Sequence, residues 1–124
     1  MMATAASRYY GYNNVSPVRF RSTEDRYEFV NTSTGEVVAW LDKGVDFGHE
    51  DVFVAEAFRD GGNITVIIMY GLEWRGTWAS PIHLKHLVVS GAINDMASGV
   101  YIYRWIDEDG DSIPTPGEVE QVYP

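Results

Sequence analysis

Apolar and polar residues alternate along most of this chain, and that period of two constrains its fold more than any other feature. Clusters of Asn, Asp, Ser, Thr and Gly, which are typical of turns, separate the alternating segments. The segments expected to form strands are residues 18–21, 27–30, 36–40, 51–59, 63–70, 82–90, 100–106 and 119–123. Seven or eight short strands joined by turns predict an all-β protein, a single β-sandwich of the jelly-roll type.

Two of these segments carry more detailed predictions. Residues 63–70 are apolar at successive positions, so both faces of this strand are expected to be covered, as in the centre of a sheet. Residues 82–90 are expected to form another strand, and only residues 94–98 are expected to contain a helical turn.

The chain of 124 residues is long enough for one domain with a sizeable core, which we place at residues 18–124. Residues 1–17 do not follow the alternating pattern, although they contain several tyrosines. Three interpretations of this N-terminal arm are open: a strand donated to a neighbouring subunit, a segment docked on its own domain, or a disordered tail. Strand donation would make open head-to-tail contacts, which generate filaments.

The composition argues against several functional classes. The net charge of −9, from 18 acidic against 9 basic residues, disfavours nucleic acid as a partner. The lack of cysteine excludes disulfides, zinc–thiolate sites and cysteine nucleophiles. No apolar run approaches the roughly 18 residues of a membrane-spanning helix, so no membrane span is expected.

Residues 107–118, with the sequence DEDGDSIPTPGE, carry the most specific chemical signal. Acidic residues stand at loop positions 1, 3, 5 and 12, which is the spacing of a calcium-binding loop with a backbone carbonyl at position 7. The predicted Ca²⁺ ligands are the carboxylates of Asp107, Asp109, Asp111 and Glu118, the carbonyl of Ile113, and a hydroxyl or water at Thr115. The alternative is a solvated hairpin loop, because Asp, Gly and Pro also favour turns.

This loop departs from the helix–loop–helix calcium hand in three respects. Ser112 stands at position 6, where the hand uses glycine for a left-handed turn, and Pro114 stands at position 8. The flanking residues 100–106 and 119–123 are expected to be strands rather than helices. The run Asp-x-Asp-Gly-Asp-x-Ile-Pro instead resembles the loops of thrombospondin type 3 repeats and the calcium loops of extracellular β-sandwich proteins.

A second acidic cluster lies in the first half of the chain. It consists of four carboxylates around two glycines: Asp42, Asp46, Glu50 and Asp51. Because their spacing matches no fixed motif, two interpretations are open: a second metal ion, held between subunits, and a solvated loop.

Three of the five asparagines begin Asn-x-Ser/Thr sequons, namely Asn14, Asn31 and Asn63. This excess over chance indicates an N-glycosylated extracellular protein, although Asn, Ser and Thr also cluster in turns. The first residues lack the basic and long apolar regions of a complete signal peptide. The chain is therefore expected to be either intracellular or secreted after removal or replacement of a signal.

No catalytic motif is apparent, and the chain is not expected to be an enzyme. His83 and His86 would point to opposite faces of the predicted strand, so they are not expected to chelate one metal ion. Trp74 and Trp78, on one predicted loop, are the best candidates for a sugar-stacking platform. The alternative places both indoles in the core of the sandwich.

The overall plan, together with the loop at 107–118, is similar to that of the archaeal extracellular filament subunits, the cannula and bundling-pilus proteins, and of the related bacterial biofilm matrix fibres. This resemblance implies a jelly roll that polymerises by donor-strand complementation and is stabilised by calcium. We therefore expect a secreted, calcium-binding structural glycoprotein that self-assembles into a filament or tube by strand addition. The alternative is a calcium-stabilised carbohydrate-binding module with glycans as partners.

Overall fold

The computed structural model describes residues 16–46, 48–60 and 64–124. Within these residues the strands are β1 (Val18–Ser22), β2 (Arg26–Asn31), β3 (Val37–Asp42), β4 (Glu50–Asp60), β5 (Ile64–Gly71), β6 (Gly99–Ile106) and β7 (Val119–Tyr123). The helical segments are α2 (Trp74–Val89) and the 3₁₀ turns η1 (Ala92–Asp95) and η2 (Pro116–Glu118). The strands form two antiparallel sheets, in the orders β1-β2-β3 and β5-β4-β6-β7, which confirms the predicted all-β, two-sheet fold.

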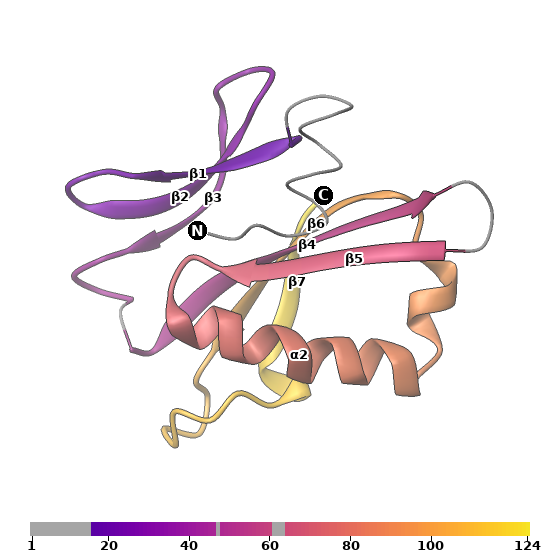
Figure 1. The fold of residues 1–124 in the computed structure, drawn as a ribbon. Helices are drawn as coiled ribbons and strands as arrows, with labels where there is room; N and C mark the ends of the chain where they lie inside the picture. Colours follow the sequence, from indigo (N-terminus) through magenta and orange to yellow (C-terminus); the bar gives the residue numbers. More distant parts are fainter. Residues whose placement is uncertain (1–15, 47, 61–63) are drawn as a thin grey trace.

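The four-stranded sheet lies between the three-stranded sheet and α2 (Figure 1). One buried cluster joins the two sheets and contains Val18, Phe29, Ala39, Leu41, Val52, Val54, Leu72 and Ile102. A second cluster joins the four-stranded sheet to α2 and contains Phe53, Ala55, Ala79, Tyr103 and Trp105. Residues 51–57 of β4 are all buried, and along the strand Val52 and Val54 enter the first cluster while Phe53 and Ala55 enter the second.

The prediction that residues 63–70 form a central strand is wrong. Among the described strands, β5 pairs only with β4 and lies at the edge of its sheet, whereas β4 is central. The apolar pattern of β5 arises because α2 packs beside it on one face while Leu72, directly after it, joins the cluster between the sheets. The hydropathy of a strand indicates which of its faces are covered, but it does not indicate whether both of its edges are hydrogen-bonded to neighbouring strands.

The predicted strand at 82–90 is also wrong, because residues 74–89 form the helix α2. Its buried residues are Gly76, Ala79, Ser80 and His83, which have helical spacing but are small or polar. The hydropathy pattern of the sequence therefore does not reveal the buried face of α2. Pro81 lies inside the helix and cannot donate to the carbonyl of Thr77, but the hydroxyl of Ser80 donates to that carbonyl at 2.9 Å.

The first turn of α2 is held by a buried carboxylate of the sheet. Asp51 of β4 is fully buried and accepts hydrogen bonds from the backbone N–H of Gly76 at 2.5 Å and of Val52 at 2.7 Å. A Cβ at Gly76 would lie 2.9 Å from the Oδ2 of Asp51, so only glycine allows this approach. Burial raises the pKa of Asp51 to about 6, although these hydrogen bonds oppose the shift.

His83 anchors the middle of α2 against the sheet. Its ring packs against Tyr103 and Phe53, with centroid distances of 4.3 and 5.8 Å. Burial, with a smaller contribution from the charge of His86, lowers the pKa of His83 to about 4. The imidazole is therefore neutral in the folded protein, and protonation opposes folding.

This burial predicts a pH-dependent difference between the wild type and His83→Leu. His83 contributes stability that is present above its unfolded pKa of 6.5 and is lost as the pH falls toward about 4. Between pH 7 and pH 5, the wild type should lose about 2 kcal/mol relative to His83→Leu. Urea unfolding at both pH values measures this difference, and parallel pH profiles would contradict it. Burial of Asp51 has the opposite effect and stabilises the folded protein at low pH. Because both proteins contain Asp51, this contribution cancels in the difference between them.

Two further expectations concern the N-terminal arm and the absence of a membrane span. The predicted arm at residues 1–17 lies outside the described residues, except for Ser16 and Pro17. In the part of the chain that the structure describes, no helix has the length and apolar character needed to cross a membrane.

Candidate metal centre

Residues 107–118 form the connection between β6 and β7, as the sequence predicted. The two strands pair antiparallel, with Trp105, two residues before the loop, opposite Val119, directly after it. The backbone N–H of Asp107 donates to the carbonyl of His49 at 2.9 Å, which ties the start of the loop to the segment before β4. Both ends of the loop are therefore fixed by the four-stranded sheet.

Four carboxylates converge inside this loop: Asp107, Asp109, Asp111 and Glu118. One oxygen from each lies within 4.8 Å of the others, so the group could hold a metal ion. Glu118 is buried and Asp107 is half-buried, whereas Asp109 and Asp111 are exposed. The cluster is thus buried on the side of the sheet and open to solvent on the other.

The backbone curls around these carboxylates through two left-handed residues, Gly110 with φ 75° and Ser112 with φ 60°. Ser112 is the only non-glycine residue with positive φ among residues 16–46, 48–60 and 64–124. Its N–H donates to Oδ2 of Asp107 at 3.0 Å. The left-handed turn that the sequence placed at position 6 is therefore present without glycine, at a conformational cost of roughly 1–2 kcal/mol.

Glu118 is held in position by surrounding donors. Its Oε2 accepts from the N–H of Glu108 at 2.7 Å, and its Oε1 accepts from the hydroxyl of Thr115 at 3.0 Å and from the indole of Trp105 at 3.5 Å. Thr115 and Glu118 form a capping box at the start of η2. Sequence reasoning missed the role of Trp105, since its position two residues before the loop gives no sign that its indole reaches Glu118.

Asp107 provides a test of whether these residues fit a cation. Its Oδ1 is buried and has no hydrogen-bond partner among the described residues. A buried carboxylate oxygen without a partner is strongly disfavoured, and a cation among the four carboxylates would satisfy it.

The two exposed carboxylates, Asp109 and Asp111, shift each other's pKa in opposite directions. Hydrogen bonding with Asp111 lowers the pKa of Asp109. The N–H of Ile113 lowers the pKa of Asp111, but the hydrogen bond and charge of Asp109 and the charge of Asp107 outweigh it and raise that pKa. A bound cation would offset the repulsion from Asp109 and Asp107 that raises the pKa of Asp111.

The two other predicted ligands are less constrained. Ile113 is half exposed, and its N–H donates to Oδ1 of Asp111 at 2.8 Å. The hydroxyl of Thr115 is directed to Glu118. The Ile113 carbonyl and the ninth-position oxygen at Thr115 remain predictions.

The second acidic cluster does not assemble into a comparable group among the described residues. Asp42 pairs with Arg26 at 3.2 Å, and its N–H donates to Oδ2 of Asp46 at 2.9 Å. Glu50 pairs with Arg104 at 3.4 Å, and the buried Asp51 accepts from the N–H of Gly76 in the first turn of α2. Each carboxylate thus has its own partner.

Glycosylation at the three sequons remains a prediction. Asn31 is half-buried, and its Oδ1 accepts from the N–H groups of Ser33 at 2.9 Å and Thr34 at 3.1 Å. Asn14 and Asn63 lie outside the described residues.

Trp74 and Trp78 lie on the first two turns of α2, not on the predicted loop. They are 56% and 39% exposed, so neither is a core residue. Their rings stack with centroids 6.0 Å apart and planes 16° apart, and the guanidinium of Arg75 lies 4.1 Å from the Trp74 ring. The pair forms an exposed aromatic surface at one end of the helix.

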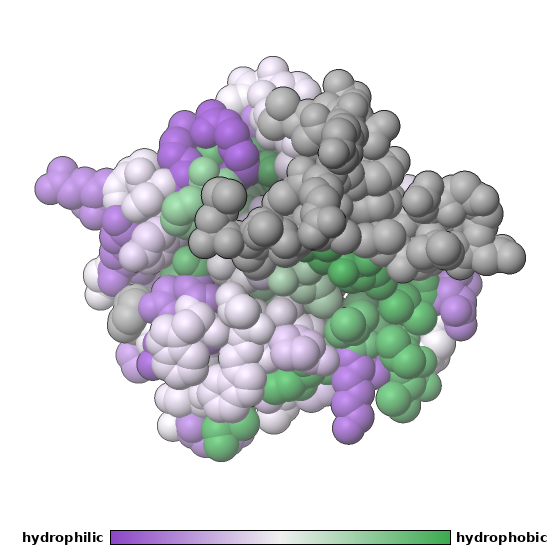
Figure 2. All heavy atoms as spheres, in the orientation of Figure 1, coloured by the Kyte–Doolittle hydropathy of each residue, from purple (hydrophilic) through white to green (hydrophobic). Residues whose placement is uncertain are grey.

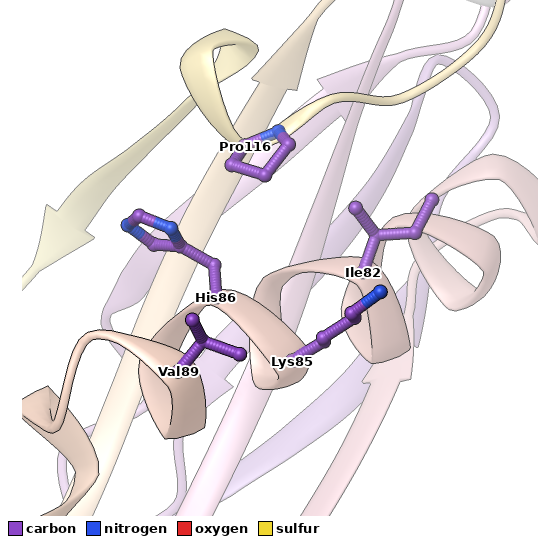
Figure 3. A pocket seen from close by; sticks show the side chains of 5 residues that line it. All are labelled: Ile82, Lys85, His86, Val89 and Pro116. Atoms are coloured by element: carbon purple, nitrogen blue, oxygen red, sulfur yellow. The ribbon is translucent and has the colours of Figure 1, made fainter.

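The other end of α2 carries apolar residues on the surface shown in Figure 2, and Val88 and Val89 are exposed there. A shallow pocket of about 370 Å³ lies between this half of α2 and η2. It is lined by Ile82, Lys85, His86, Val89 and Pro116 (Figure 3).

The helix also changes the relation between His83 and His86. On the predicted strand they would face opposite ways, but on α2 they are one turn apart, with ring centroids separated by 6.1 Å. The expectation that they lie on opposite faces is wrong for this reason.

Comparisons with protein-family models, curated proteins and solved structures find no match to the chain.

Proposed function

We propose that this domain is a calcium-binding structural protein in which one Ca²⁺ ion joins β6 to β7. The observation that carries this proposal is the convergence of four carboxylates around the unpartnered Oδ1 of Asp107. Asp107, Asp109, Asp111 and Glu118 would supply carboxylate oxygens, and Ile113 and Thr115 would complete the six to eight ligands that calcium prefers.

The donor set favours calcium over other common ions. All four converging groups are carboxylates, whereas zinc and copper prefer nitrogen or sulfur ligands. Magnesium keeps several waters and requires a near-ideal octahedron, so it uses one or two carboxylates rather than four. Four acidic groups within 4.8 Å suit a large, flexible coordination shell.

The proposed ion acts as a staple rather than a sensor. The loop is flanked by β6 and β7, and β6 is also paired with β4. Calcium sensors respond through helices that rotate relative to one another, and strands fixed in a sheet have no such freedom. Calcium in this loop would therefore stabilise a cysteine-free domain much as a disulfide would.

We further propose that the protein is an extracellular subunit that self-assembles into a filament or tube by strand addition. The three sequons and the lack of cysteine support this proposal. So does β5, an apolar strand that pairs only with β4 among the described strands and lies at the edge of its sheet. The donor would be the arm preceding β1, supplied by the next subunit.

Electron microscopy of the purified protein tests assembly and calcium together. We expect filaments or tubes in calcium, their dissociation in chelator, and soluble monomers when residues 1–15 are deleted. This deletion keeps Ser16, whose hydroxyl donates to the buried carboxylate of Glu56 at 2.5 Å. Normal polymerisation of the truncated protein would rule out strand donation by the arm.

A carbohydrate-binding module is the second candidate, favoured by the exposed and stacked pair Trp74 and Trp78. If this function is correct, a glycan array should detect binding that is lost in Trp74→Ala and Trp78→Ala. Trp40→Ala is the matched control, because Trp40 is 40% exposed but lies on β3. Equal effects of all three substitutions would reject the platform.

A further inference from the structure

His83 is a buried imidazole whose polar atoms are unused. It is 7% exposed, and both ring nitrogens are buried without a hydrogen-bond partner among the described residues. The rings of Tyr103 and Phe53 pack against it. Buried polar atoms are nearly always paired, so these nitrogens call for a ligand or a specific role.

His86 is the neighbouring group that could share such a ligand. It is exposed, one helical turn from His83, and reaches from α2 toward η2 beneath Pro116 (Figure 3). The ring centroids of the two histidines are 6.1 Å apart. Two imidazoles bound to one tetrahedral ion, with Zn–N of about 2.0–2.1 Å, have centroids roughly 5–6 Å apart. A small rotation of the exposed His86 side chain would bring the pair into that range.

We propose that His83 and His86 form a two-histidine site for a divalent transition-metal ion such as Zn²⁺. The remaining coordination positions would be taken by water, which reaches His86 through the pocket between α2 and η2. The side chain of Lys85 extends toward Ile82 and away from His86 (Figure 3).

The proposed site and the acidic loop would select different ions. Imidazole suits zinc, copper and nickel, whereas clustered carboxylates suit calcium. The inference therefore does not depend on calcium binding by residues 107–118, and either site can fail without the other.

Calorimetric titration of the calcium-saturated full chain with Zn²⁺, on protein without a polyhistidine tag, tests the site. We expect one zinc ion per chain in the wild type. His86→Ala should weaken binding by roughly 100-fold, because loss of one of two linked ligands removes their effective concentration. His83→Leu should have the same effect, and zinc should shift the NMR signals of the His83 ring nitrogens in the wild type.

Two substitutions serve as controls. His49→Ala removes the third histidine, which lies before β4, and should bind zinc like the wild type. Asp109→Asn removes a carboxylate of the acidic loop and should leave zinc binding unchanged. Wild-type zinc affinity in His86→Ala, or zinc-induced shifts confined to residues 107–118, would overturn the proposal.

Discussion

Replacing Glu118 by Gln should abolish the stabilisation of this domain by calcium. At a calcium concentration of about 100 times the Kd, an ion that binds only the folded state adds about 2.7 kcal/mol to the free energy of unfolding. Glu118 is the buried carboxylate that closes the loop, and an amide has neither its charge nor two equivalent oxygens. Differential scanning calorimetry should show a rise in Tm of roughly 10 °C with calcium in the wild type and no rise in Glu118→Gln.

Glu108→Gln is the matched control for this prediction. It removes the same charge from the same loop, but Glu108 is exposed and lies outside the converging group. Only its backbone N–H is involved, donating to Glu118 at 2.7 Å. Calcium should stabilise Glu108→Gln as it does the wild type. If both variants respond equally, or if calcium has no effect on the wild type, the loop is a solvated hairpin.

Gly71→Ala should destabilise the domain by about 3 kcal/mol, through overpacking and the loss of helix-capping contacts. A Cβ at Gly71 would lie 2.4 Å from the backbone nitrogen of Thr77 and 2.7 Å from the carbonyl oxygen of Glu73. The obstructing atoms are backbone, so α2 itself has to move away from the end of β5. That movement would separate Gly76 from its acceptor, Asp51.

Gly44→Ala is the control, because no atom lies within 4 Å of a Cβ at Gly44. A glycine replaced where alanine fits the backbone stabilises by about 0.4–1 kcal/mol through the unfolded chain. Opposite signs for the two substitutions in guanidinium unfolding would establish that close packing of α2 on β5 determines the effect. A neutral Gly71→Ala would mean that the helix end is free to shift.

The acidic loop was recognisable before the structure because its information is local. The positions of Asp107, Asp109, Asp111 and Glu118 along the chain already bring their side chains toward one centre. The left-handed turn at Ser112 follows from the same spacing, although its residue type argued against it. The support from Trp105 depends on the pairing of β6 with β7, and the link from Asp107 to His49 depends on β6 lying beside β4, so the loop sequence alone predicts neither.

The predictions that failed depend on contacts between distant segments. A stripe of small and polar residues, Gly76, Ala79, Ser80 and His83, is a helix face only because the four-stranded sheet lies against it. The same packing places Trp74 and Trp78 on the surface and brings His83 within one turn of His86.

Alternation of polar and apolar residues predicted the strands, clusters of turn residues predicted the turns, and the spacing of acidic residues predicted the candidate cation loop, because all three depend on neighbours in the chain. Whether β5 or β4 is central, and whether residues 74–89 are helix or strand, was settled by packing. The physical reason is that a free face of the sheet had to be covered. The segment after β5 could cover it closely only as a helix, with Gly76 and Ala79 against the sheet and Asp51 at its first turn.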